Sequence, residues 1–342
     1  MIEYNRIQNF NSEKNTSVVS FLSNVLDRRV ENKDWDWEFN SFNNTIFHFL
    51  SNNGDVVATQ SMLPICLLHL GKDFLTYKSE STYILREYRG KKIFENLYEN
   101  TVLEAFEKGG EIIWGFTPAV NAWKNNFNFS VEEDIILNIT VQCGFAKMDS
   151  VKRILKNLVV SPLIFLNRIV FSSQSKSITM TEMIEQNQIK SFNEAFLSKF
   201  GYCGIDLTKQ YQDWRLDSNT FVNYKKIGYY KGEVLIGVAI YSITEQVLNI
   251  TYMAILDEQY YGEAIGLLYR SARKNQNFLR INYWGNSNNA TNKIIFKLLS
   301  SKFLSKSSLD PSRSFVYKFK DSNTFESKDL LINALWTEGI RI

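Results

Sequence analysis

The sequence Leu75-Thr-Tyr-Lys-Ser-Glu-Ser-Thr-Tyr-Ile-Leu85 runs directly into Arg86-Glu-Tyr-Arg-Gly-Lys-Lys92. The first part is rich in β-branched and aromatic residues and predicts a long strand, Phe74 to Leu85. The segment after the basic turn, Ile93 to Lys108, has apolar residues spaced by four and stops at two glycines, which predicts a helix. The stretch therefore predicts a strand that enters a helix through a short cationic turn.

This turn has the features of a phosphate-binding loop. A strand-to-helix turn directs backbone N–H groups at one point, where the helix dipole adds positive charge. Gly90 allows the backbone to approach a ligand closely, and Arg89, Lys91 and Lys92 add cations suited to a pyrophosphate or a 3′-phosphate. The alternative interpretation is a solvated basic helix start.

The same order of motifs occurs twice along the chain. The paired positions are Trp37 and Trp214, Gly54 and Gly232, Tyr88 and Tyr260, Trp114-Gly115 and Trp284-Gly285, and Asn121-Ala122 and Asn289-Ala290. Their separations are 177, 178, 172, 170 and 168 residues, so they drift only by loop-sized amounts. This regularity predicts one α/β unit used twice.

Each copy is predicted to be a mostly antiparallel mixed sheet flanked by helices, which places the chain in the mixed α/β class. Expected elements of the first copy are Ile2–Arg6, Ser17–Arg28, Thr45–Ser51, Val56–Leu63 and Glu111–Phe116; those of the second are Ile178–Met183, Ile189–Phe200, Asn223–Tyr230, Val234–Ile243 and Leu248–Leu256. The predicted division is a first domain at 1–148, a helical linker at 149–175 and a second domain at 176–342. The linker is basic and apolar-striped, and we expect it to pack against one domain; docking on a membrane surface is the alternative.

Composition narrows the function classes. The chain has 342 residues, enough for two domains at about 150 residues each. His48 and His69 lie in apolar strand-like contexts, which disfavours triad and zinc chemistry, so we expect no metal. The cysteines Cys66, Cys143 and Cys203 form no C-x-x-C pair, and no secretory or membrane-spanning segment is evident, which favours reduced thiols and a cytoplasmic location. A net charge of +3 is too balanced to indicate a nucleic-acid partner.

The segment from Tyr88 to Phe94 resembles the acetyl-CoA signature of the GNAT superfamily of N-acetyltransferases, Arg/Gln-x-x-Gly-x-Gly/Ala. Lys92 replaces the central glycine, and Phe94 stands where glycine or alanine is often found. The segments 112–116 and 121–129 resemble the family's next strand and helix. The resemblance implies acetyl-CoA, or another acyl-CoA, as co-substrate, with its pantetheine arm between two splayed parallel strands. Trp114 and Phe116 on one strand would face Thr82 and Ile84 on the other.

The resemblance also implies a set of site residues. Expected contacts to the coenzyme come from the strand end, the turn and two helix starts: Thr82, Ile84, Leu85, Arg89, Gly90, Lys91, Lys92, Ile93, Phe94 and Asn121. Asn121 has the alternative role of helix cap. Trp35 and Trp37 either line an acceptor pocket or belong to the core.

Acyl transfer from a thioester to an amine needs a base, an oxyanion donor and a proton for the thiolate. Glu80 is the expected base; the alternative is a surface carboxylate on the strand that pairs with Lys78 or a neighbour. Tyr83 is the expected proton donor, with Tyr77 or water as substitutes. A backbone N–H of the strand end, residues 82–84, would stabilise the oxyanion.

The second copy is expected to have lost the coenzyme. Its loop, residues 261–266, carries no cation, and Glu263 would repel a phosphate. We therefore expect the second domain to shape the pocket of a small amine acceptor. The resemblance implies a tandem bacterial acyltransferase, of a kind associated with polysaccharide biosynthesis, acting on an amino sugar or sugar nucleotide. Two alternatives are an aminoacyl-tRNA-dependent enzyme similar to the peptidyl transferases, and a catalytically degenerate binding module.

Overall fold

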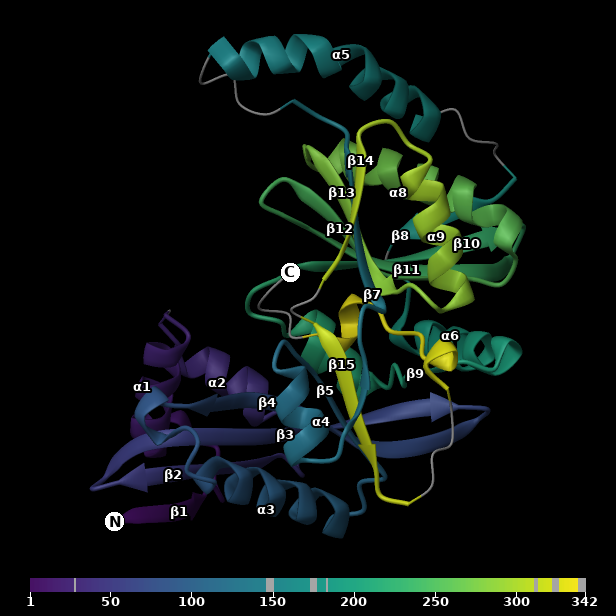
Figure 1. Cartoon of the computed structure of the whole chain (residues 1–342). Helices are drawn as coiled ribbons and strands as arrows, with labels where there is room; N and C mark the ends of the chain where they lie inside the picture. The colour runs from purple at the N-terminus through teal and green to yellow at the C-terminus, as the bar shows by residue number, and fades with distance from the viewer. Residues whose placement is uncertain are drawn as a thin grey trace.

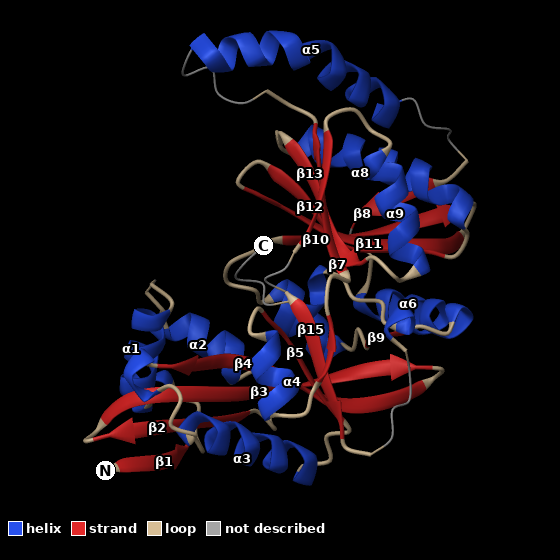
Figure 2. Ribbon diagram, viewed as in Figure 1, coloured by secondary structure: helices blue, strands red, loops and turns tan. Residues whose placement is uncertain are grey.

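Two mixed β-sheets flanked by helices make up the computed structural model of the chain (Figures 1 and 2). The structure describes residues 1–27, 29–145, 151–172, 177–182, 184–310, 313–321 and 326–337. Arg28 and Met183, which end two predicted elements, and parts of the predicted linker lie outside the described residues. The predicted mixed α/β class is confirmed.

Helices cover both faces of the first sheet. Its strands, in spatial order, are β1 (Ile2–Arg6), β2 (Ile46–Asn52), β3 (Asp55–His69), β4 (Lys72–Ile84), β5 (Ile112–Thr117), β15 (Ser314–Phe319) and β6 (Ser130–Glu132), with β9 (Cys203–Ile205) paired to β3. On one face lie α3 (Ile93–Glu107) and α4 (Val120–Asn126), and on the other α1 (Thr16–Val25) and α2 (Asn32–Phe39). Alternating strand residues therefore enter two different cores.

The second sheet repeats this plan. Its strands, in spatial order, are β14 (Ser305–Leu309), β7 (Ile136–Gln142), β13 (Arg280–Asn286), β12 (Val247–Ile255), β11 (Val234–Thr244), β10 (Tyr224–Lys231) and β8 (Thr179–Glu182). The helices α8 (Tyr261–Asn275) and α9 (Ala290–Ser300) pack on one face, and α6 (Gln186–Phe200) and α7 (Lys209–Gln212) are on the other.

The two sheets exchange a strand. β7 comes from the first half of the sequence but pairs between β13 and β14, from Gln142 opposite Arg280 to Ile136 opposite Asn286. β15 comes from the second half but pairs between β5 and β6 (Figure 1). The sheets are thus assembled across the linear division of the chain, whose limits at 148 and 176 stay a prediction.

The tryptophans that revealed the repeat contact each other. Trp37 Nε1 donates to the carbonyl of Trp214 at 2.7 Å, and Trp214 Nε1 donates to the carbonyl of Trp37 at 2.8 Å. The rings stack with centroids 5.6 Å apart. This reciprocal contact relates equivalent positions of the two copies. Trp35 and Trp37 are both buried, so the structure supports the core interpretation of these residues.

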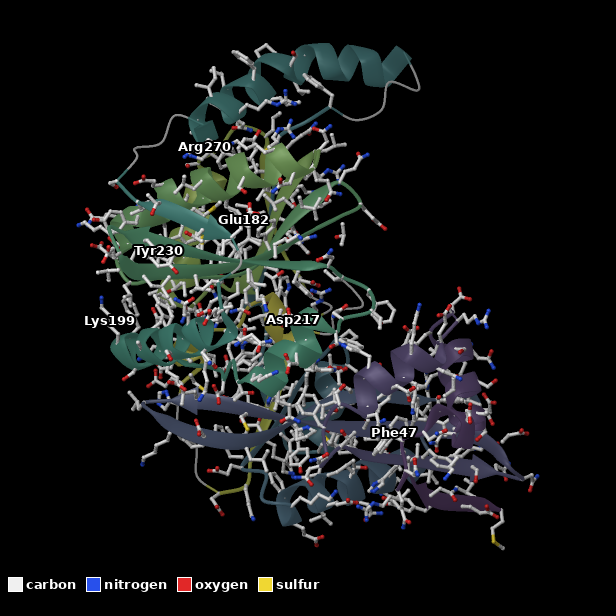
Figure 3. The ribbon with its side chains drawn as sticks, turned by 180° about the vertical axis from the view of Figure 1, so that it is seen from behind. Phe47, Glu182, Lys199, Asp217, Tyr230 and Arg270 are labelled. Carbon is white, nitrogen blue, oxygen red and sulfur yellow. The ribbon has the colours of Figure 1, made fainter. Side chains whose placement is uncertain are left out.

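The segment between the copies contains one long helix, α5 (Val151–Ser172), which lies at the outer end of the second sheet (Figure 1). Its C-terminal part is anchored to α8. Phe171 stacks on Tyr269, and Arg270, which is labelled in Figure 3, donates to the Phe171 carbonyl at 3.1 Å. Phe165 and Val159 on α5 are exposed. In the part of the chain that the structure describes, none of the helices combines the length and apolarity needed to cross a bilayer.

Candidate active site

The parallel strands β4 and β5 separate in the middle of the first sheet. They pair only from Thr76 opposite Ile112 to Lys78 opposite Trp114, after which β4 continues to Ile84 and β5 to Thr117. Strands that diverge leave backbone N–H and C=O groups turned toward the space between them. The divergent ends of β4 and β5, residues 79–84 and 115–117, are called the β4–β5 cleft below. Gly115 follows the last paired residue of β5, and a Cβ there would come within 3.4 Å of Ser79 on β4.

A β-bulge shapes the β4 side of the cleft. Ser81 has a φ of 49°, and the register with β3 shifts between Thr59 and Ser61. The Thr59 hydroxyl donates to the Ser81 carbonyl at 2.8 Å and holds the bulge in place. A bulge adds one residue and changes which side chains share a face. Thr82 consequently lies on the α3 side of the sheet.

The predicted coenzyme contacts of β4 face α3. The Thr82 hydroxyl donates to Gln60 Oε1 at 2.7 Å, and Ile84 and Leu85 pack in the small cluster that holds Leu97 of α3. Ile93 and Phe94, at the start of α3, pack in the same cluster. The structure therefore gathers four of these residues around the start of α3, and Thr82 contacts Gln60 of β3.

The turn between β4 and α3 exposes its cations and leaves the helix start uncapped. Gly90 and Lys92 both have left-handed backbone, with φ of 73° and 58°, and no side chain among the described residues caps α3. The first N–H groups of a helix have no intrahelical partner, so they remain available to an anion. The Arg89 guanidinium folds back onto the Ile84 carbonyl at 3.2 Å, and the Lys91 ammonium lies 5.5 Å from the Tyr88 ring centre.

The two expected catalytic residues occupy the other face of β4. Glu80 is buried and forms an ion pair with Lys78, whose ammonium lies 5.9 Å from the Trp114 ring centre. Tyr83 packs against the large core on that same side. Glu80 is therefore not the surface carboxylate of the alternative interpretation, although it is paired to Lys78 as that interpretation expected. Its role and that of Tyr83 stay predictions.

Asn121 lies exposed in the first turn of α4. The N-cap of α4 is Ala119, whose backbone N–H donates to the Thr117 hydroxyl at 3.0 Å, so the capping alternative for Asn121 is wrong. Its counterpart in the second copy, Asn289, does cap its helix, accepting from the backbone N–H groups of Thr291 and Asn292.

Sequence reasoning missed a polar network on the α3 side of the cleft. Gln60 Nε2 donates to the Ser79 hydroxyl at 3.0 Å while its Oε1 accepts from Thr82. Tyr98 of α3 is fully buried nearby, and burial raises the pKa of its phenol well above the usual range, an effect that the neighbouring Ser79 hydroxyl opposes. One signal for Gln60 was present, since Gln60-Ser61 interrupts a strand that is otherwise mostly apolar.

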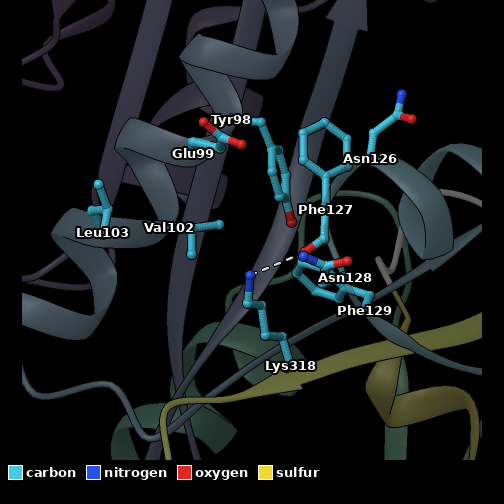
Figure 4. A pocket seen from close by; sticks show the side chains of 9 residues that line it. All are labelled: Tyr98, Glu99, Val102, Leu103, Asn126, Phe127, Asn128, Phe129 and Lys318. Atoms are coloured by element: carbon cyan, nitrogen blue, oxygen red, sulfur yellow. Dashed lines mark hydrogen bonds between the residues drawn. The ribbon is translucent and has the colours of Figure 1, made fainter.

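Tyr98 also borders a hollow of about 280 Å³ between α3 and the end of α4 (Figure 4). Lys318 of the exchanged strand β15 donates to the Phe127 carbonyl there at 3.0 Å. None of the site residues predicted from the sequence lines this hollow.

His48 has partners that its sequence context did not show. It is buried between β2 and α3, where its Nε2 lies 2.8 Å from Glu104 Oε2 and its Nδ1 lies 2.9 Å from the Thr101 hydroxyl. Both partners come from α3, more than fifty residues further along the chain. Burial lowers the pKa of His48, which the Glu104 carboxylate opposes.

The second copy has an equivalent cleft, but its own chain occupies it. β12 and β13 pair from Val247 opposite Arg280 to Ile250 opposite Tyr283 and then separate. The backbone N–H of Asn286 donates to the Ile332 carbonyl at 3.1 Å, and Gly285 bridges to Asn333. Because β7 already pairs with the other edge of β13, this C-terminal segment, 330–336, enters on the β12 side.

The loop of the second copy is also unlike the first. Glu263, in the first turn of α8, is buried and accepts from the Ser177 hydroxyl at 2.5 Å and from the Ile178 backbone N–H at 3.1 Å. The Asp257 side chain adds a second carboxylate just before the helix. Negative charge at this helix start disfavours a phosphate.

Known structures share this architecture. A GCN5-related N-acetyltransferase of Anabaena variabilis superposes with a TM-score of 0.62 at 12% identity, over 93% of this chain and 73% of that one. A tandem GNAT protein from the clavulanic acid biosynthesis pathway gives 0.59 at 8% identity, over 95% and 100%. An N-myristoyltransferase of Saccharomyces cerevisiae with bound myristoyl-CoA gives 0.57 at 12% identity, over 92% and 78%.

No protein-family model matches the chain, and no curated protein matches it in sequence. The structural similarities, all at 12% identity or less, therefore establish the fold alone. The chain has a tandem GNAT fold, as its motifs predicted.

Proposed function

We propose that this chain is an acyl-CoA-dependent N-acyltransferase, with acetyl-CoA as its first expected donor. The coenzyme would bind in the cleft between β4 and β5, with its pyrophosphate at the uncapped start of α3. The acceptor would be a small amine such as an amino sugar or sugar nucleotide. The similar structures support this proposal, because they include N-acetyltransferases and a transferase with bound myristoyl-CoA.

The contrast between the two copies is the observation that carries the proposal. Both have separated parallel strands. Only the first combines this opening with a cationic turn; in the second, residues 330–336 fill the opening and the loop at 261–266 carries no cation. If both copies had degenerated, we would not expect the first copy to keep its separated strands together with a cationic turn.

The residues of the cleft suggest a direct transfer. The amine nitrogen attacks the thioester carbonyl carbon, the C–S bond breaks and the thiolate leaves. Glu80, whose carboxylate is paired with the ammonium of Lys78, would take the amine proton. Tyr83 or water returns a proton to the thiolate. A backbone N–H of residues 82–84 would stabilise the oxyanion, an interaction worth roughly 3 to 4 kcal/mol.

A thermal-shift titration with CoA and acetyl-CoA tests the proposal. A ligand at a hundred times its Kd stabilises the folded state by about 2.7 kcal/mol. We expect stabilisation by both compounds, and at least tenfold weaker binding in Arg89→Ala and Gly90→Ala, because these changes remove a cation and add a Cβ at a left-handed backbone position.

Gly262→Ala, at the corresponding loop of the second copy, is the matched control and should leave binding unchanged. Stabilisation by neither compound would overturn the proposal. Stabilisation by aminoacyl-tRNA in their place would favour the tRNA-dependent alternative.

A further inference from the structure

A polar hollow lies on the second sheet, on the face opposite α8 and α9. Its volume is about 190 Å³, and side chains of β7, β12 and β13 form its floor, including Asn138, Asn249, Asn282 and Trp284. A sheet face packed against helices is apolar, as the other face of this sheet is. The asparagines therefore need an explanation other than packing.

A chain of hydrogen bonds fixes two of these asparagines. The Thr140 hydroxyl donates to Asn282 Oδ1 at 3.1 Å, Asn282 Nδ2 donates to Asn249 Oδ1 at 3.3 Å, and Asn249 Nδ2 donates to the Thr244 hydroxyl at 2.9 Å. Each amide in this chain both donates and accepts, which fixes its orientation. The side chains of Asn249 and Asn282 are thus held in place and already have hydrogen-bond partners.

Two polar atoms beside this chain have no partner. Trp284 is 4% exposed, and its Nε1–H has no acceptor within the described residues. The buried Oδ1 atom of Asn138 has no donor within them either. Asn138 and Trp284 stand directly opposite each other on β7 and β13, so their side chains share one face. A buried polar group without a partner costs about 1 to 3 kcal/mol, which favours a ligand that satisfies both.

The charges at the rim are paired. The Arg313 guanidinium lies 5.3 Å from the Trp284 ring centre and forms an ion pair with Asp310 at 3.4 Å. Trp284 and Asn138, which line the hollow from opposite positions of the ladder, therefore bring one N–H donor and one carbonyl acceptor to it, and the rim charges of Asp310 and Arg313 are opposite in sign. An ammonium only donates and a carboxylate only accepts, so neither matches both atoms, whereas a hydroxyl does.

We propose that this hollow binds a hydroxyl-bearing ring, the sugar ring of the acceptor. One hydroxyl accepts from Trp284 Nε1–H and donates to Asn138 Oδ1. The hollow adjoins the first copy, because the Trp284 ring lies 5.5 Å from the ring of Phe116 on β5, the strand that borders the coenzyme cleft. The assignment of the ring to the acceptor rests on the proposed function, whereas the recognition of hydroxyls rests on the hollow alone.

Ligand-observed NMR with the full chain, in the absence of CoA, tests this inference. The probes are D-glucosamine, D-glucose and cyclohexylamine, so that the ring, the hydroxyls and the amine are varied separately. We expect both sugars to bind and cyclohexylamine not to bind. Trp284→Phe and Asn138→Leu should each weaken sugar binding about tenfold, which corresponds to about 1.4 kcal/mol.

Ser308→Ala is the matched control, since Ser308 is exposed on β14 and stands opposite Asn138 in the ladder. Circular dichroism checks that each variant folds. Equal binding of cyclohexylamine, no sugar binding, or sugar binding unaffected by both variants would overturn the inference. CoA stabilisation is measured on the same samples: its presence without sugar binding overturns the hollow alone, and its absence with sugar binding overturns the proposed acyl transfer alone.

Discussion

At the scale of single residues, Ser81 decides how the cleft is organised. In a regular strand, residues three apart point to opposite faces. The extra residue at the Ser81 bulge places Glu80 and Tyr83 on one face of β4 and leaves Thr82 on the face toward α3. The expected catalytic pair and an expected coenzyme contact are thereby separated to the two sides of the same strand.

The buried ion pair of Lys78 and Glu80 permits a test that separates stability from catalysis. Glu80→Gln leaves Lys78 buried without its carboxylate partner, and we expect a loss of about 3 to 5 kcal/mol in the free energy of unfolding. The double variant Lys78→Met/Glu80→Gln removes both charges and should recover most of that loss, as measured by urea denaturation. If Glu80 is the base, this stable double variant still binds CoA but transfers acyl groups roughly 10² to 10⁴ times more slowly. Near wild-type turnover in the double variant would contradict the catalytic role.

Asp206, outside the candidate site, gives a pH-dependent prediction. Burial, and next the Asp73 carboxylate, raise the pKa of Asp206 from 3.8 to about 6, and its Oδ1 has no hydrogen-bond partner among the described residues. The folded state therefore binds more protons than the unfolded state between these values, and the free energy of unfolding falls as the pH rises through this window. Asp206→Asn should be more stable than the wild type by roughly 1 to 2 kcal/mol at pH 8, after allowance for partial solvent access, and nearly equal to it at pH 4. Urea denaturation at the two pH values measures this, and an equal difference at both would contradict it.

At the scale of elements, the local patterns predicted which segments form strands and helices. The strand predicted at 74–85 is β4 (Lys72–Ile84), and the helix predicted at 93–108 is α3 (Ile93–Glu107). Their signals, apolar spacing and a glycine stop, are contained in the segments themselves. The partner of a strand is not contained in it. For this reason the exchange of β7 and β15 between the sheets could not be predicted from the sequence.

The candidate site also has one part that the sequence predicts and another part that only the folded structure shows. The turn from Arg86 to Lys92 is continuous in the chain, so the sequence motif could identify it. Gln60 and Tyr98 reach the cleft from β3 and α3, and only the packing of these elements against β4 brings them together. The filling of the second cleft by residues 330–336 depends on a contact made across the whole second copy. The sequence suggested the loss of coenzyme binding there only from the absence of a cation in the loop at 261–266 and from Glu263.

At the scale of the whole molecule, the two copies are interlocked. Their largest core is continuous, containing Val18 and Trp37 of the first copy together with Phe196 and Trp214 of the second. The carbonyl of Cys66 on β3 accepts from the backbone N–H of Asp206, and β9 extends the edge of β3. Each sheet lacks an interior strand unless the other half of the chain supplies it. Neither sequence half can complete its sheet alone.

This interlocking predicts that the chain unfolds in one cooperative transition, although its length and its repeat suggest two domains. Loss of the first sheet removes the partners of β15 and disrupts the shared core, so the second copy should unfold with the first. Differential scanning calorimetry should show a single peak, with a calorimetric enthalpy equal to the van't Hoff enthalpy. If CoA binds only the first copy, it should move that entire peak to higher temperature. Two peaks, of which CoA moves one, would show that the exchanged strands do not couple the copies.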